Sequence, residues 1–158
     1  MGILAVLTAL EQVELGMADV YDWLSGEFAD DDDAAGFFAR MSREEISHRN
    51  LIQYQRRMIR SADATTDPPV DAPMDEIRDT LQTIHDFRNQ SRRPTLAQAL
   101  LFAMTMESRM AERLHRDVIV QARPELGDLM RSLAADDLRH QRRLEEFVGR
   151  RRELFETG

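Results

Sequence analysis

The chain has 158 residues and a formal net charge of −8, with 42% hydrophobic and 32% charged residues. This length suits one domain with a substantial core, and the composition is typical of a helix-rich protein rather than a disordered or fibrous one. The acidic balance argues against nucleic-acid binding, which needs basic side chains to neutralise phosphates. We therefore predict a single domain over residues 1–158 and no nucleic-acid partner.

The sequence contains no cysteine. Thiolate nucleophiles, disulfides, iron–sulfur clusters and cysteine-held iron are therefore excluded, and any bound metal must use oxygen and nitrogen ligands. The first ten residues carry no basic leader and run directly into Glu11 and Glu14, which is typical of a helix start and not of a signal peptide or a membrane span. We expect a cytoplasmic protein without a membrane partner.

Hydrophobic periodicity predicts four long helices and one shorter helix. In chain order they cover about Ile3–Ser25, Asp33–Arg60, Asp75–Arg88 (the short one), Leu96–Gln121 and Pro124–Leu154. The segment Ser61–Met74 has three prolines and no helical period, so it is a connection. Short turns elsewhere make the first two and the last two long helices antiparallel, while residues 61–94 return the chain along the molecule. These features predict an all-α four-helix bundle with one long crossover.

Each long helix has an apolar row, with residues spaced alternately by three and four, that is interrupted near its middle by residue types that bind metals. Such a row is expected to face the bundle interior. The four rows are Leu7, Leu10, Glu14, Met17, Tyr21, Leu24; then Phe38, Met41, Glu45, His48, Ile52; then Leu96, Leu100, Ala103, Glu107, Met110, Leu114; and finally Leu126, Met130, Leu133, Asp137, His140, Leu144, Phe147.

Buried carboxylates that face one another repel, and no arginine or lysine lies on these rows to compensate them. Bound metal cations would turn the repulsion into coordination. The spacing of three residues between Glu45 and His48 puts this pair on one helix face, and the spacing of Asp137 and His140 is the same. We predict a two-metal site with six ligands: Glu14, Glu45, His48, Glu107, Asp137 and His140.

An internal repeat supports two equivalent halves. The segment beginning at Glu14 (ELGMAD) matches the segment beginning at Glu107 (ESRMAE), and residues 44–48 (EEISH) match residues 136–140 (DDLRH), at almost the same offset along the chain. Two copies of one helical hairpin that face each other across a pseudo-twofold axis would supply equivalent ligands to two ions.

These residues together resemble the ferritin-like superfamily and, within it, the rubrerythrins, which carry Glu-x-x-His in both the second and the fourth bundle helix. The resemblance implies a ferritin-like bundle with a di-iron carboxylate centre, and it implies that Tyr21 is a catalytic residue beside that centre. The chain departs from the family in three ways. Asp137 stands where a Glu is usual, Met110 stands where rubrerythrins have a further carboxylate, and no cysteine-bearing rubredoxin domain is present.

The resemblance implies a non-haem di-iron oxidoreductase that reacts with peroxide or oxygen and takes electrons from an unidentified donor. Iron is favoured over zinc because several carboxylates share the site with nitrogen ligands, and manganese stays open. Two other functions also stay open: a ferroxidase or iron-storage protein in a larger oligomer, and a metal-free helical scaffold or binding module. We expect a homo-oligomer, with a dimer favoured.

Several polar residues near the predicted ligands lie off the interior rows. We expect the acidic ones to be solvated. In the helix predicted over Asp33–Arg60, however, a second acceptable apolar row would make Glu44 a ligand; this row is Phe37, Met41, Glu44, His48 and Leu51. The histidines off the rows are expected at the surface. The acidic residues are Glu11, Glu44, Glu112 and Asp136, and the histidines are His85 and His115.

Overall fold

The computed structural model describes residues 2–62, 67, 69–72, 74–108, 120 and 127–155, and it describes their side chains except at residues 62 and 127–138. Its α-helices are α1 (Ile3–Glu27), α2 (Asp32–Ala62), α3 (Met74–Arg88), α4 (Leu96–Ser108) and α6 (Gly127–Arg150), and a short 3-10 helix (Arg152–Leu154) follows. No strand occurs among the described residues, where Gly2 and Pro69 form an isolated bridge. The predicted all-α class is confirmed.

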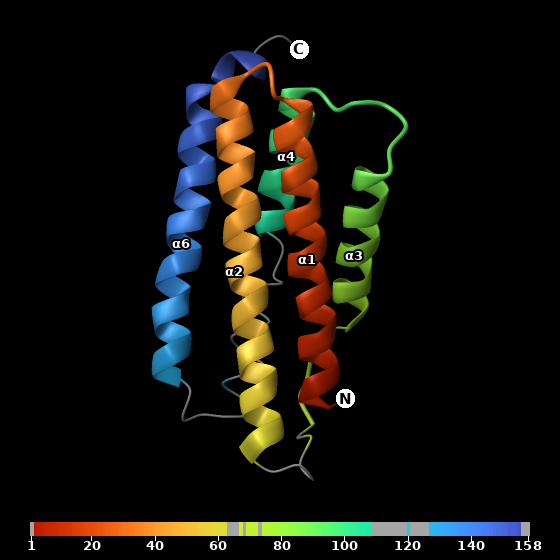
Figure 1. Cartoon of the computed structure of the whole chain (residues 1–158), viewed down its shortest axis with the longest axis vertical. Helices are drawn as coiled ribbons and strands as arrows, with labels where there is room; N and C mark the ends of the chain where they lie inside the picture. The colour runs from red at the N-terminus through yellow and green to blue at the C-terminus, as the bar shows by residue number, and fades with distance from the viewer. Residues whose placement is uncertain are drawn as a thin grey trace.

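The helices lie side by side along the long axis of the molecule (Figure 1). Helices α1 and α2 run in opposite directions and pack on each other, α6 contacts α2 and α4, and α3 packs on the outer side of α1. Helix α3 belongs to the segment that carries the chain from the far end of α2 back to the start of α4, at the opposite end of the molecule. Side chains of α1, α2, α4 and α6 can therefore meet in one interior.

The predicted helix bounds agree closely with α1, α2, α3 and the start of α4. The last helix was expected to continue to Leu154, but α6 ends at Arg150. Gly149 weakens its last turn, because glycine disfavours helix by about 1 kcal/mol relative to alanine, and the chain then tightens: the N–H of Arg151 donates to the carbonyl of Val148 at 3.0 Å. The predicted helical residues 109–119, 121 and 124–126, including Pro124, lie outside the described residues.

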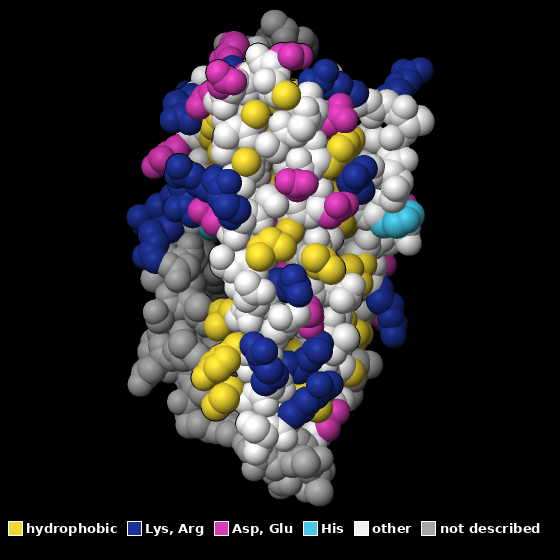
Figure 2. Space-filling model, in the orientation of Figure 1, with side chains coloured by type: hydrophobic (Ala, Val, Ile, Leu, Met, Phe, Trp, Pro, Cys, Tyr) yellow, Lys and Arg dark blue, Asp and Glu magenta, His cyan; other side chains and the backbone are white. Residues whose placement is uncertain are grey.

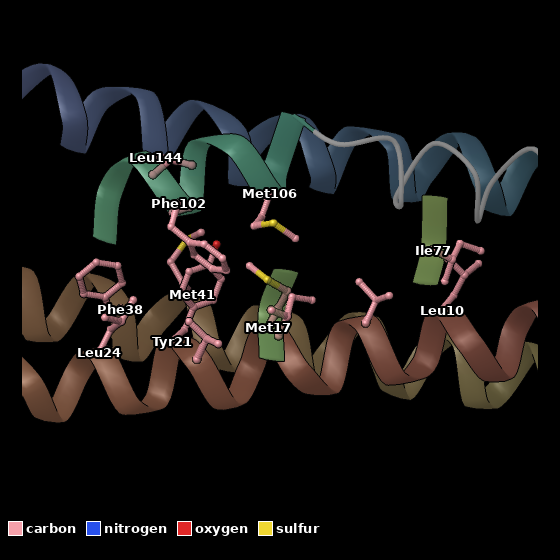
Figure 3. Packing of buried hydrophobic residues seen from close by; sticks show 14 of the residues in the cluster. Leu10, Met17, Tyr21, Leu24, Phe38, Met41, Ile77, Phe102, Met106 and Leu144 are labelled. Atoms are coloured by element: carbon pink, nitrogen blue, oxygen red, sulfur yellow. The ribbon is translucent and has the colours of Figure 1, made fainter. Parts of the chain in front are cut away.

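The interior rows predicted for the first two helices face the core. The six row residues of α1, from Leu7 to Leu24, are all buried, and on α2 only His48 of the predicted row is partly exposed. Figure 3 shows how row residues of α1, such as Tyr21, lie opposite Phe102 and Met106 of α4 and Leu144 of α6. The core therefore joins helices from both halves of the sequence.

Aromatic packing attaches α3 to the rest of the molecule. The Phe87 ring stacks on Phe102 of α4 with 3.8 Å between the ring centroids, and it meets Trp23 of α1 edge-on at 6.1 Å. Ile84 packs so closely on α1 that a β-carbon at Gly16 would lie 3.0 Å from its Cγ2 atom. Helix α3 is thus packed on the core.

The face that shows α1 and α2 has mixed chemistry (Figure 2). Arginines and carboxylates are interspersed on it with small groups of hydrophobic side chains. Nowhere in the described ranges is a helix both long enough and apolar enough to span a membrane. The large hydrophobic residues with exposed side chains are Leu15, Tyr54, Met58, Leu101, Met104, Val120 and Phe155.

The turn between α1 and α2 is fastened by Asp31. Its Oδ1 atom accepts the N–H of Ala34 at 3.0 Å, which caps α2, and also accepts Nη2 of Arg151 at 2.8 Å. The Ala34 hydrogen bond is the main reason that the pKa of Asp31 lies below its ordinary value of 3.8, and Arg151 acts in the same direction. Asp31 therefore caps α2 and also ties the end of α6 to this turn.

We expect Asp31→Ala to lower the free energy of unfolding by about 1 kcal/mol at pH 7, the usual cost of a lost helix cap. Because the folded pKa of Asp31 is lowered, its contribution is present above the unfolded value of 3.8 and is lost as the pH falls through the folded value. Urea unfolding at pH 7 and at about pH 3 checks this. Asp30→Ala, at an exposed neighbour, is the control. An equal loss from Asp31→Ala at both pH values would contradict a charge-dependent cap.

Candidate metal centre

Five of the six predicted ligands meet inside the molecule. Glu14 comes from α1, Glu45 and His48 from α2, Glu107 from α4 and His140 from α6. Their side chains are 6%, 3%, 20%, 7% and 2% exposed in that order. The rows of four different helices thus bring acidic and imidazole groups to one buried level, with His48 nearest to solvent.

Glu45 lies between the two imidazole rings. Its Oε2 atom is 3.3 Å from Nδ1 of His48, and its Oε1 atom is 3.7 Å from Nε2 of His140. Glu14 approaches the same His48 nitrogen at 3.7 Å, and Glu107 approaches the same His140 nitrogen at 3.5 Å. The ring centroids are 5.7 Å apart. Each imidazole therefore faces two carboxylates, His48 through Nδ1 and His140 through Nε2.

Glu45, His48 and His140 each offer one ligand atom, and these atoms all lie within 4.8 Å of one another. Neutral imidazole nitrogen and carboxylate oxygen are common ligands of divalent zinc, iron and manganese in proteins. This group of three residues could therefore hold a metal ion, with Glu14 and Glu107 adjacent to it.

His140 fits the role of a ligand because its ring lacks other partners. The residue is 1% exposed, and neither of its ring nitrogens makes a hydrogen bond to a described residue. Leaving a buried polar atom unsatisfied usually costs about 1–3 kcal/mol. Burial lowers the pKa of His140 to about 4, against the opposing attraction of Glu44. The ring is therefore neutral near pH 7, the form in which imidazole binds metal.

The carboxylates show the repulsion that the sequence predicted. Burial, with repulsion from Glu107, raises the pKa of Glu45 well above its ordinary value of 4.5. Burial raises the pKa of Glu107 to about 7, although the hydrogen bond from Tyr21 opposes this. Burial alone would lower the pKa of His48, but its interactions with Glu14 and Glu45 outweigh burial and raise the pKa to about 12. Without metal, protons and one imidazolium ion neutralise much of the cluster.

Tyr21 lies beside this cluster. It is fully buried, and its hydroxyl donates a hydrogen bond to Oε1 of Glu107 at 2.7 Å. Its ring packs against Phe38 with 6.2 Å between the centroids. The tyrosine therefore fixes one carboxylate of the cluster and links it to the aromatic core.

The alternative row on α2 that would make Glu44 a ligand is not supported, because Glu44 is more exposed than Glu45. The Glu45 side chain is 3% exposed and that of Glu44 is 24% exposed. Oε1 of Glu44 accepts Nη2 of Arg143 on α6 at 2.5 Å. Glu44 was also expected to be solvated, and it is instead half-buried in an ion pair. Its helix position turns it sideways toward α6 rather than inward.

Glu11 was expected to be solvated, and this prediction is wrong. The residue is 7% exposed, and its carboxylate accepts Nε2 of Gln53 and Nη1 of Arg56, each at 2.5 Å, with Nε of Arg49 at 3.8 Å. The spacing of seven residues between Arg49 and Arg56 puts both on one face of α2 and could have indicated a buried acidic partner. In the same way, the spacing of three residues between His140 and Arg143 puts both on one face of α6 and could have indicated a shared acidic partner, which is Glu44.

The other polar residues of the sequence analysis have mixed outcomes. His85 is at the surface as predicted, with a side chain that is 69% exposed. Several of the predicted positions lie outside the described residues or have side chains outside them, and they stay predictions: Asp137, Met110, Glu112, His115 and Asp136.

The chain matches no protein-family model, no curated protein and no solved structure. The resemblance to the rubrerythrins therefore stays a prediction, and the functional argument depends on the buried cluster itself.

Proposed function

We propose that the chain is a ferritin-like four-helix bundle that binds a pair of iron ions and acts as a di-iron oxidoreductase of the rubrerythrin type. In this proposal α1, α2, α4 and α6 are the bundle helices, and residues 61–94 form the crossover around α3. The direction of the helices in Figure 1 supports this topology. The observation that carries the metal proposal is His140, a buried neutral imidazole whose Nε2 faces two carboxylates without a hydrogen bond.

The proposed ligands come from both halves of the chain. Glu45 would be a ligand between the two histidines, because its two oxygens face the two imidazole rings. His48 and His140 would supply the nitrogen ligands, and Glu14 and Glu107 would complete the carboxylate set. Asp137 would be the sixth ligand, since it precedes His140 on α6 by three residues, the spacing of Glu45 and His48.

When bound, a pair of iron ions would supply the electrons that reduce peroxide or oxygen. The described residues would control water and protons around this chemistry. Met17, Met41 and Met106 are buried in the same core as Tyr21 (Figure 3) and would keep water from this part of the interior. The hydroxyl oxygen of Tyr21 lies 2.7 Å from Oε1 of Glu107 and donates its proton to that atom, so we assign Tyr21 to orienting the carboxylate and holding a proton near the substrate. A separate electron donor and a homodimer complete the proposal.

Anaerobic titration with Fe(II), monitored by isothermal titration calorimetry, tests the metal site. We expect about two ions per chain for the wild type, as in di-iron carboxylate bundles. His140→Ala should reduce the affinity by more than about 100-fold, because loss of a direct ligand should exceed the 10–100-fold cost of losing an outer hydrogen-bond partner. His85→Ala, which removes an exposed histidine on α3, is the matched control and should bind as the wild type does.

The same titration separates the alternatives. Wild-type protein that takes up neither Fe(II) nor Mn(II) would leave the metal-free scaffold as the better description. Mixing the Fe(II)-loaded protein with peroxide and, separately, with oxygen then identifies the oxidant: faster oxidation by peroxide supports the rubrerythrin-like reaction, whereas loading of many more ions per chain with oxygen would favour storage.

A further inference from the structure

Two buried polar atoms face each other on the outer side of His140. Its Nδ1 atom is 3.8 Å from Oε2 of Glu44, and neither atom has a hydrogen-bond partner among the described residues. This distance is about 1 Å longer than an ordinary charge-assisted hydrogen bond. Both atoms are shielded from solvent, and a hydrogen bond between them would remove the energetic cost of leaving them unsatisfied.

Arg143 holds Glu44 in this place. Nη2 of Arg143 donates to Oε1 of Glu44 at 2.5 Å, which leaves Oε2 as the oxygen that faces the histidine. Arg143 and His140 lie three residues apart on α6, whereas Glu44 comes from α2. The arginine therefore fixes a carboxylate of the neighbouring helix against a ring on its own helix.

The two nitrogens of His140 have different surroundings. Nε2 faces Glu45 and Glu107 within the candidate centre, and Nδ1 faces Glu44 outside it. A neutral imidazole carries one N–H and one lone pair, so a ring that binds metal through Nε2 must carry its hydrogen on Nδ1. That hydrogen would point to the one unpaired oxygen of Glu44.

We propose that Glu44, held by Arg143, is a positioning residue that accepts the Nδ1–H of His140 and so directs Nε2 to the metal ions. This inference rests on the proposed function. A carboxylate behind a ligating histidine fixes the tautomer and ring orientation and makes the ring a stronger ligand. Glu44 acts through His140 and is itself no ligand.

The device belongs to one half of the site. In the internal repeat, the position equivalent to Arg143 is Leu51, which has no charge to hold a carboxylate. The two histidines face the cluster through different nitrogens: His48 through Nδ1 and His140 through Nε2. The two metal positions are therefore chemically different, and changes at Glu44 or Arg143 should weaken the position at His140 selectively.

The test measures Fe(II) affinity by anaerobic calorimetry and, on the Co(II)-substituted protein, the exchangeable imidazole N–H signals by paramagnetic proton NMR. Glu44→Ala should weaken one of the two binding events by about 10–100-fold, and the His140 N–H signal should disappear through fast exchange with water. Glu44→Gln should lose less affinity, because an amide oxygen still accepts a hydrogen bond.

Arg143→Gln provides a second route that leaves the carboxylate in place, and Arg142→Gln, at the exposed neighbour, is its matched control. Arg143→Gln should weaken the same binding event as Glu44→Ala, and Arg142→Gln should not. Thermal unfolding of each metal-free variant shows that it is folded.

Two results would overturn the inference while leaving the metal site intact. If wild-type protein and both Glu44 variants bind equally and keep the N–H signal, Glu44 has no positioning role. If Glu44→Gln and Glu44→Ala lose one ion equally, Glu44 is a direct ligand. Wild-type protein that binds no metal would instead refute the proposed function, and this inference with it.

Discussion

The variant Glu45→Gln should be more stable than the wild type without metal and less stable than the wild type with metal. Without metal we expect Glu45→Gln to be the more stable by about 1–3 kcal/mol at pH 7, because glutamine removes the cost of burying a carboxylate charge, which is at least of this order. With metal at about a thousandfold excess over its Kd, the wild type should gain about 4 kcal/mol, and the variant should gain little. Thermal and urea unfolding, each with and without Fe(II) under anaerobic conditions, measures both differences.

The sign of the metal-free effect follows from the raised pKa of Glu45. A folded-state pKa above the ordinary value of 4.5 means that the folded protein loses stability as the pH rises past 4.5, and glutamine removes this loss. The advantage of Glu45→Gln should therefore shrink below about pH 4.5. Glu146→Gln, at an exposed position of α6, is the control. If Glu45→Gln is less stable than the wild type when both are free of metal, the charge of Glu45 is fully compensated by its protein neighbours.

The second large effect is expected at Phe38, the centre of the aromatic packing near the turn between α1 and α2. Phe38 is fully buried, and its ring lies 5.3, 5.8 and 6.2 Å from the rings of Phe37, Phe28 and Tyr21. Phe38→Ala should lower the free energy of unfolding by about 3–5 kcal/mol, the usual cost of removing a buried aromatic side chain. Urea unfolding of the metal-free protein measures it.

The same substitution should also affect the candidate centre, because Phe38 supports the ring of Tyr21, which in turn holds Glu107. Phe155→Ala removes a phenyl ring that is 44% exposed and should change the stability by less than about 1 kcal/mol. A loss below about 1 kcal/mol from Phe38→Ala would mean that the surrounding rings close the cavity.

Much of this architecture could be predicted from local sequence patterns. The alternation of three and four residues placed Glu14 and Tyr21 on the buried side of α1 and Glu45 on the buried side of α2, because helical spacing fixes which residues share a face. The same reasoning explains why His140 meets residues from the other half of the chain. Asp137 was predicted in the same way, and its side chain lies outside the described residues.

The residues that sequence reasoning missed are those whose partners come from another helix. Glu11 was expected in solvent because it lies off the predicted row, yet α2 places Arg56 directly beside it. Arg143 also lies off the predicted row of its helix, yet it reaches Glu44 across the helix interface. Helical periodicity gives the face of one helix but not the rotation of its neighbour. The spacing of Arg49 and Arg56 could thus indicate an acidic partner without identifying it as Glu11.

The contact between Tyr21 and Glu107 joins residues 86 positions apart in sequence, and the imidazole pair likewise spans the two hairpins. A chain without cysteine has no disulfide to fasten such distant segments. An ion coordinated by both hairpins would serve as a reversible cross-link that closes a very long loop, and its removal would release the halves from each other first. The supply of the metal that this site binds would then determine how long each molecule resists proteolysis.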